Sequence, residues 1–124
     1  MIKLLVIADD LTGATDTGVQ FSKQGIATLV TFDMDVDIKT LSADLQVLVN
    51  DTESRHLPPD KAANGVKEII NSARKQGVEF FYKKTDSTLR GNVGAELDAA
   101  LEASGSKKLA FIPFFYIIIH EKEF

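Results

Sequence analysis

Charged and hydroxyl-bearing side chains gather in three short stretches of this sequence, and each stretch follows an apolar run. The first stretch is Asp9-Asp10-Leu11-Thr12-Gly13, the second runs from Asn50 to Arg55, and the third runs from Lys83 to Gly91. Arginine can bind a carboxylate or phosphate through two parallel hydrogen bonds, and lysine adds a compact positive charge. An aspartate can accept a hydrogen bond from a ligand hydroxyl or act as a general base. These residue types together predict recognition of a small, oxygen-rich anion.

The candidate catalytic residues are Asp10 and Asp86, and either could be the general base. Asp10 is favoured because it follows the buried first strand directly. Arg55, Lys84 and Arg90 are the candidate groups that bind the anion. The backbone N–H groups after Gly13 and Gly91 also favour an anion, because each is expected to open a helix.

A purely structural role is the alternative for each of these residues. Thr12 or Asp10 would cap the first helix, Asp86 or Ser87 would cap the third, and Arg55 would lie on a solvated loop. For one residue alone the two interpretations are about equally supported. For the three stretches together we favour function, because capping requires one residue per helix rather than five.

Apolar runs alternate with segments of helical periodicity, which is typical of a parallel sheet covered by helices. Strands are expected over 2–8, 27–32, 45–49, 78–82 and 109–112. Helices are expected over 14–24, from Pro58 to about Gly77, and around an inner face of Val93, Leu97, Ala100 and Leu101. The predicted fold class is therefore α/β, a three-layer parallel sheet flanked by helices, with about five strands. Ligands of such sheets bind beyond the carboxyl ends of the strands, where the three polar stretches lie.

Composition narrows the classes of protein further. The chain has 124 residues, a net charge of −4, two histidines and no cysteine. This length predicts one domain over residues 1–113, followed by an atypical apolar tail over 114–124. The charge argues against nucleic-acid and anionic-membrane partners, and the scarce histidine and cysteine argue against a metal site. The apolar start is too short for a signal peptide or a membrane span, so we expect a cytoplasmic protein.

Several sequence motifs of known chemistry are missing. There is no G-x-x-x-x-G-K-[ST] phosphate loop and no G-x-G-x-x-G dinucleotide fingerprint. The carboxylates of the segment 33–44 lack the glycine and closing glutamate of a calcium loop, so we interpret it as a solvated connection. Asp9 and Asp10 are adjacent, whereas phosphatases with an aspartyl nucleophile need one residue between the two aspartates. A phosphate donor, if one is used, must bind elsewhere.

The three motifs Ile7–Gly18, Asn50–Arg55 and Tyr82–Asn92 resemble the N-terminal domain of four-carbon acid sugar kinases, in the same order and over about residues 2–113. The resemblance implies a two-domain enzyme that phosphorylates threonate, erythronate or 3-oxo-tetronate with ATP and Mg²⁺. It implies that the N-terminal domain holds the sugar acid and a separate domain holds the nucleotide. The substrate contacts implied here are Asp10, Arg55, Lys84, Thr85, Asp86 and Ser87, with Arg90 as a weaker addition.

The sequence departs from that family after Pro113, where a loop with proline, glycine and a basic residue is expected. An aromatic and β-branched run stands there instead, and such a run is prone to aggregate when exposed. A frameshift truncation and a natural stand-alone variant would both explain it. We therefore expect the sugar-acid-binding half of a kinase, inactive alone because the ATP-binding domain is absent. The alternative is a non-catalytic domain that binds a small anion or self-associates through residues 114–124.

Overall fold

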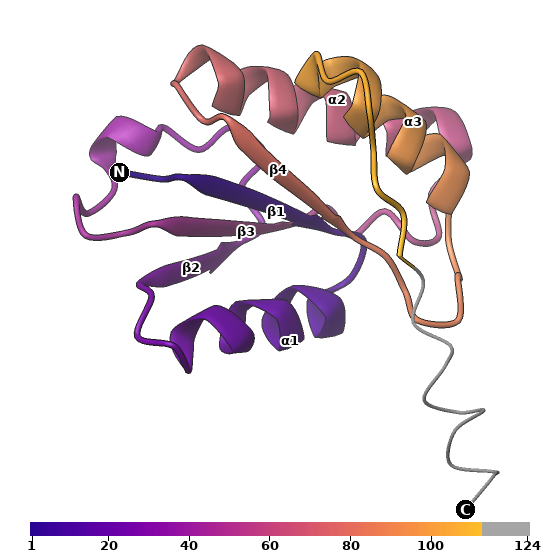
Figure 1. The fold of residues 1–124 in the computed structure, drawn as a ribbon. Coiled ribbons are helices and arrows are strands. Elements are labelled where there is room, and N and C mark those ends of the chain that lie inside the picture. Colours follow the sequence, from indigo (N-terminus) through magenta and orange to yellow (C-terminus); the bar gives the residue numbers. More distant parts are fainter. Residues whose placement is uncertain (113–124) are drawn as a thin grey trace, which may run out of the picture.

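A four-stranded parallel sheet with helices on both faces forms the structure (Figure 1), a computed structural model that describes residues 1–112. The strand order is β2-β3-β1-β4. The strands are β1 (Leu4–Ala8), β2 (Thr28–Thr31), β3 (Val47–Asp51) and β4 (Phe80–Lys84); the helices are α1 (Leu11–Ser22), α2 (Pro59–Lys75) and α3 (Val93–Ser104), with a short 3₁₀ helix at Ile38–Thr40. The predicted α/β class with a parallel, helix-flanked sheet is confirmed.

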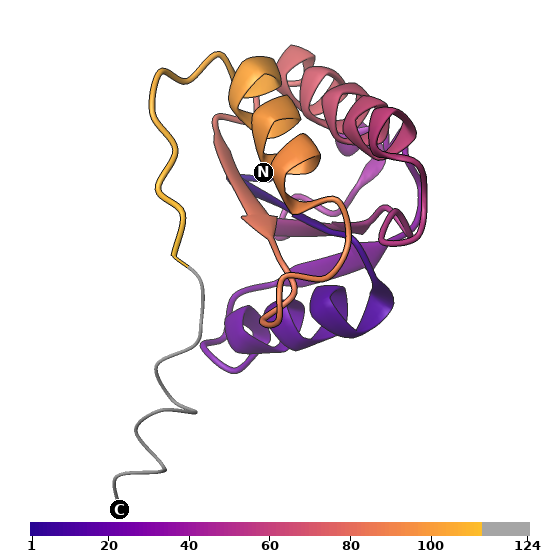
Figure 2. The same ribbon diagram turned by 90° about the vertical axis from the view of Figure 1, so that its right-hand side faces the viewer.

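The central strands β1 and β3 are apolar on both faces because helices cover both sides of them. Val6 and Val49 pack toward α1, in a cluster with Ala14, whereas Ile7 and Leu48 pack toward α2 and α3. Seen from the side, α1 lies below the sheet and α2 and α3 lie above it (Figures 1 and 2). Alternate side chains of a strand point to opposite faces, so a strand buried on both sides must be continuously apolar.

Residues 109–112 form no strand, so the prediction of a fifth strand is wrong. The segment after α3 leaves the helix at Gly105, whose φ of 72° makes the left-handed turn that glycine adopts without strain. It then runs down the β4 side of the molecule, apart from the sheet, and does not pair with β4 (Figure 2). Apolar periodicity identifies a segment suited to a sheet, but it does not provide the hydrogen-bonding partner.

The observed helices begin and end within a few residues of the predicted boundaries. The inner face of α3 differs in part from the predicted one. Ala100 of the predicted inner face is buried, together with Glu96, Ala99 and Ala103, whereas the predicted Leu97 and Leu101 are only half-buried. The longest helix, α2, has 17 residues and carries charges along its outer face. Within residues 1–112, no helix is both long enough and apolar enough to cross a bilayer.

The order of the strands places a topological switch beside β1. From β1 the chain crosses under the sheet through α1 to β2, and from β3 it crosses over the sheet through α2 to β4. The loops that follow β1 and β3 therefore leave in opposite directions, which opens a crevice at the carboxyl ends of these strands. All three polar stretches of the sequence meet at this edge.

We expect Ile70→Ala, in the middle of α2, to lower the free energy of unfolding by about 2–5 kcal/mol, because truncation of a fully buried side chain leaves a cavity. Urea unfolding followed by circular dichroism measures the loss. The matched control is Val19→Ala on α1, where the side chain is 45% exposed and the change should stay within about 0.5 kcal/mol. Equal losses in the two variants would contradict the placement of the core.

Candidate functional site

The guanidinium of Arg55 joins the loops that follow β1, β3 and β4. It donates to both carboxylate oxygens of Asp9, with Nε–Oδ2 and Nη2–Oδ1 distances of 3.1 and 3.2 Å. Its Nη1 lies 3.1 Å from Asp10 Oδ2, and its Nη2 lies 3.6 Å from Asp86 Oδ1. The Arg55 side chain is only 11% exposed. Carboxylates from two loops that lie far apart in the sequence, after β1 and after β4, are therefore held around one largely buried cation.

These contacts change the expected role of Arg55. The hydrogen bond to Asp9 raises the pKa of Arg55, so the guanidinium stays charged. Its two-pronged geometry, which could have bound a ligand carboxylate, is already used by Asp9. In this structure Arg55 therefore holds the protein's own carboxylates in place.

Asp10 has a capping role and a second contact. It is the N-cap of α1, where its Oδ1 accepts a hydrogen bond of 2.9 Å from the backbone N–H of Gly13. Its other oxygen, Oδ2, faces Arg55. A Cβ at position 13 would lie 2.9 Å from Asp10 Oδ1, so glycine keeps this cap accessible. The structural alternative for Asp10 is therefore correct, and it coexists with a place in the cluster.

Asp86 is bound mainly by its own loop. Its Oδ2 accepts from Arg90 Nε at 2.8 Å, from the backbone N–H of Arg90 and from the hydroxyl of Thr88, while Arg90 Nη2 reaches Oδ1 at 3.1 Å. The hydrogen bond from the Arg90 side chain holds the pKa of Asp86 well below its usual range. A carboxylate that holds a proton so weakly is a poor general base at neutral pH. Asp86 does not cap α3, whose N-cap is Asn92.

Lys84 is the last residue of β4, and it lies half-buried at the same edge of the sheet. Its Nζ donates to the backbone carbonyl of Thr85. Among residues 1–112, no carboxylate lies within ion-pair distance of this ammonium. Thr85 is half-buried and Ser87 is exposed, so both bring a hydroxyl close to the edge.

Sequence reasoning missed a buried layer beneath this cluster. Glu96 of α3 is 1% exposed, and its Oε1 accepts a hydrogen bond of 2.9 Å from Ser54 and lies 3.6 Å from the ammonium of Lys83. Burial is the main cause that raises the pKa of Glu96 and lowers the pKa of Lys83. The available signal was a glutamate three residues after Val93 and four before Ala100, on the inner side of a short helix.

Backbone strain is concentrated in the same loops. Two non-glycine residues within the described part of the chain have a positive φ: Glu53 at 47° and Leu89 at 61°. Such conformations cost of order 1 kcal/mol or more and persist where surrounding contacts impose them. Glu53 lies two residues before Arg55 in the loop after β3, and Leu89 lies between Asp86 and Arg90 in the loop after β4.

Asp51, the last residue of β3, is a further buried carboxylate. Its Oδ1 accepts from the backbone N–H of Glu53, whereas Oδ2 has no hydrogen-bonding partner in the described part of the chain. Burial raises the pKa of Asp51 to about 6. No three histidine or acidic side chains within residues 1–112 are arranged to hold a metal ion.

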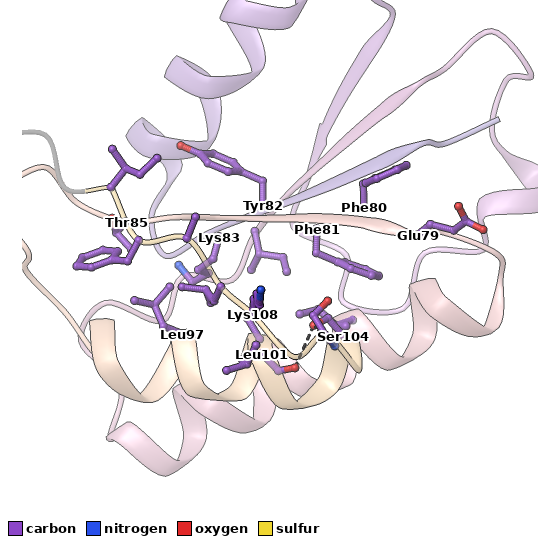
Figure 3. A pocket seen from close by; sticks show the side chains of 18 residues that line it. Glu79, Phe80, Phe81, Tyr82, Lys83, Thr85, Leu97, Leu101, Ser104 and Lys108 are labelled. Carbon is purple, nitrogen blue, oxygen red and sulfur yellow. Dashed lines mark hydrogen bonds between the residues drawn. The ribbon is translucent and has the colours of Figure 1, made fainter.

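A cavity lies beside the polar cluster rather than in it. It has a volume of about 620 Å³ and separates β4 and α3 from the segment 106–112 (Figure 3). Phe81 and Lys83 point from β4 toward α3, where Leu97 and Leu101 line the opposite wall (Figure 3). Thr85 is the member of this lining that lies closest in sequence to Asp86. The walls of the cavity are mostly aromatic and aliphatic, in contrast to the charged edge of the sheet.

Gly91→Ala should lower the free energy of unfolding by about 1–3 kcal/mol. Gly91 has a φ of 88°, and an added Cβ would lie 2.8 Å from Asp9 Oδ2 and 3.3 Å from Arg55 Cγ. Gly94→Ala is the matched control, because a Cβ there meets nothing within 4 Å and alanine favours the helix. Urea unfolding of both variants tests the result; equal stability of the two would contradict the close approach at Gly91.

The buried carboxyl of Asp51 should make the protein less stable as the pH rises. The unfolded chain releases this proton near pH 3.8 and the folded chain near pH 6, so the folded state binds more protons between these values. Stability then falls from about pH 4 to about pH 6, by at most about 3 kcal/mol, and stays lower above it. Asp51→Asn should remove this fall in urea unfolding measured from pH 4 to 7.5. An unchanged slope in the variant would refute the assignment to Asp51.

Comparison with known proteins places this arrangement in a family. The chain is 45% identical over 112 residues to a D-threonate kinase of Salmonella typhimurium, and 36% identical over 112 residues to a D-erythronate kinase of Heliobacterium modesticaldum. Each alignment covers 90% of this chain and 26% of the relative, so the chain spans about a quarter of the length of these kinases.

A solved structure shows the same fold. A domain of unknown function from Bordetella bronchiseptica, crystallised with bound citrate as a domain-swapped dimer, superposes with a TM-score of 0.75 at 41% identity, over 82% of this chain and 26% of that one. The family model described as "sugar-binding N-terminal domain" matches residues 4–117. With the three polar loops on one edge of a parallel sheet, this chain belongs to the family of sugar-binding N-terminal domains.

Proposed function

We propose that this chain binds a four-carbon sugar acid at the carboxyl ends of β1, β3 and β4, as the acceptor half of an ATP-dependent sugar-acid kinase in the cytoplasm. The observation that carries the proposal is the meeting of three polar loops around Arg55 at the topological switch of the sheet. The names of the related kinases support the class of substrate: D-threonate, D-erythronate and, for a further relative, 3-oxo-tetronate. The citrate bound to the relative from Bordetella bronchiseptica supports an anionic ligand.

Lys84 is the group that we assign to the carboxylate of the sugar acid. Arg55 is occupied by Asp9 and Asp10, whereas Lys84 has no carboxylate at ion-pair distance among the described residues. An ammonium that keeps its charge free for a ligand gives a stronger contact than one already neutralised. Thr85 and Ser87 follow on the same loop and add hydroxyl groups that suit a polyhydroxy acid.

Asp10 is the candidate base in this proposal. The reacting hydroxyl of the acid must donate its proton as its oxygen attacks phosphorus, and a carboxylate within hydrogen-bond reach serves this purpose. Asp86 is less suited, because its hydrogen bonds with Arg90 stabilise the ionised form strongly. Asp86 instead fixes the loop that carries Lys84 and Ser87, and Arg90, with a side chain 66% exposed, extends from the edge toward an incoming anion.

The phosphoryl donor, ATP with Mg²⁺, belongs to other residues of the complete kinase in this proposal. The sequence has no phosphate loop, and residues 1–112 hold no group of side chains that could bind a metal ion. In this proposal the chain binds and orients the sugar acid, which is the phosphoryl acceptor, and it provides the base. We infer that phosphoryl transfer requires a second, nucleotide-binding domain.

A second candidate function is non-catalytic: anion binding together with self-association. The domain-swapped dimer of the Bordetella bronchiseptica relative favours it. The segment proposed for self-association, residues 114–124, lies outside the described residues. Sedimentation at several protein concentrations distinguishes the two, because a concentration-independent monomer would exclude self-association.

Calorimetric titration with D-threonate, D-erythronate and 3-oxo-tetronate tests the proposal. We expect at least one acid to bind, with an affinity that ATP leaves unchanged, and Lys84→Met to weaken binding by at least tenfold because the carboxylate loses its cation. Lys67→Met is the matched control. Lys67 of α2 pairs with Glu102 of α3 and has no contact with the three polar loops in the hydrogen bonds and ion pairs of residues 1–112, so binding should persist. Heat from no acid, or equal affinity of Lys84→Met and the wild type, would refute the proposed site.

A further inference from the structure

Glu96 is a buried carboxylate on α3. It contacts Ser54 and Lys83, the residues that directly precede Arg55 and Lys84 in the sequence. We propose that Glu96 is the positioning residue that holds Arg55 and Lys84 in place, through Ser54 and Lys83 respectively. This inference rests on the proposed function for its consequence in ligand binding, but its structural part stands on the geometry alone. Glu96 touches neither Arg55 nor Lys84, so any effect on them must pass through the two intermediate residues.

The first connection runs through Ser54. The hydroxyl of Ser54 donates to Glu96 Oε1 at 2.9 Å and lies 2.6 Å from the hydroxyl of Thr52, which in turn donates to the carbonyl of Ala8. The backbone N–H groups of Ser54 and Arg55 both donate to the carbonyl of Asp9, at 3.0 and 3.2 Å. Ser54 is 2% exposed, so water cannot replace the contact that Glu96 provides.

The second connection runs through Lys83. Its ammonium lies 3.6 Å from Glu96 Oε1, and it donates to the backbone carbonyl of Lys84 at 2.8 Å. The Lys83 side chain is 4% exposed and points from β4 toward α3 (Figure 3). The charge of Glu96 therefore keeps Lys83 on the α3 face of the sheet. Lys84, the next residue of the strand, is directed to the opposite face, next to α1.

The start of α3 makes the same attachment by a second route. Asn92, the N-cap of α3, donates from Nδ2 to the carbonyls of Ser54 and Leu57 at 3.3 and 2.8 Å. Glu96 lies in the first turn of this helix, where the helix dipole favours a carboxylate. Asn92 fixes the backbone of the Arg55 loop, and Glu96 fixes the Ser54 side chain and the β4 side.

A buried ion pair responds asymmetrically to substitution. Loss of one partner leaves the other charge in a dry environment without compensation, whereas loss of both charges together is often tolerated. Glu96→Ala removes the acceptor of Ser54 and the counter-charge of Lys83. Glu96→Gln keeps an acceptor for Ser54 and removes only the counter-charge. Ser54→Ala removes only the first connection and creates little empty volume.

The test follows the Nε–H of Arg55 by ¹⁵N–¹H NMR, because hydrogen exchange at this group reports how firmly Asp9 binds it. We expect exchange at least tenfold faster in Glu96→Ala and Ser54→Ala than in the wild type, and a smaller increase in Glu96→Gln. Two controls separate positioning from general loss of stability. Glu102→Gln changes an exposed carboxylate of the same helix, and Val66→Ala removes part of a buried core side chain on α2.

Calorimetric titration of the same variants with the acid that binds the wild type gives the second readout. We expect at least tenfold weaker binding in Glu96→Ala and Ser54→Ala and unchanged binding in Glu102→Gln. Arg55 exchange in both Glu96→Ala and Ser54→Ala no faster than in Val66→Ala would overturn the inference. If Glu96→Ala fails to fold, Ser54→Ala and Glu96→Gln still decide. Failure of the wild type to bind any acid would refute the proposed function and leave the NMR result to judge the positioning role.

Discussion

One guanidinium surrounded by three carboxylates holds the candidate site together. Arg55 contacts Asp9, Asp10 and Asp86, which lie on two other loops, and its side chain is almost entirely buried. A buried ion pair is costly to form, and removal of one partner leaves an uncompensated charge that is worse. The three loops are therefore coupled, because a loop that moved away from Arg55 would leave a buried charge without its partner. This coupling pre-organises an edge of the sheet that would otherwise consist of independent loops.

The sequence was sufficient for the α/β class and for the edge of the sheet at which the polar residues meet. Continuous apolar runs that end in polar residues predicted a parallel sheet with its chemistry at one edge, and Asp10, Arg55 and Asp86 do meet there. The fifth strand could not be established in this way, because pairing depends on a neighbouring strand rather than on the composition of Leu109–Ile112. Helix α3 is present as predicted and Ala100 is buried as expected, but Leu97 and Leu101 are only half-buried, because the small alanine face packs inward instead.

Roles within the site were harder to predict than membership of it. Residue types alone favoured Arg55 as a ligand-binding group, because an arginine in a loop has two free donors in the absence of a structure. In the structure Asp9 accepts hydrogen bonds from Arg55, whereas no carboxylate among residues 1–112 lies at ion-pair distance from Lys84. Glu96 was not predicted as part of the site, although its spacing from Val93 and Ala100 places it on the inner side of α3. A single glutamate in a helix is normally solvated, and only the packed structure reveals that Ser54 and Lys83 surround it.

The candidate site contains two layers of charged side chains with different roles. Their separation explains how four acidic side chains, Asp9, Asp10, Asp86 and Glu96, fit into this part of the fold. The lower layer, Glu96 with Ser54 and Lys83, is dry and fixes positions, whereas the upper layer faces the edge of the sheet. In the upper layer Arg55 compensates Asp9 and Asp10, and Arg90 compensates Asp86. These two guanidiniums face three carboxylates, and Lys84 is a third cation at this edge, with no carboxylate at ion-pair distance among the described residues. The three aspartates of this edge are therefore matched by three cations, Arg55, Arg90 and Lys84, so an anion that approaches the edge does not meet a net negative charge.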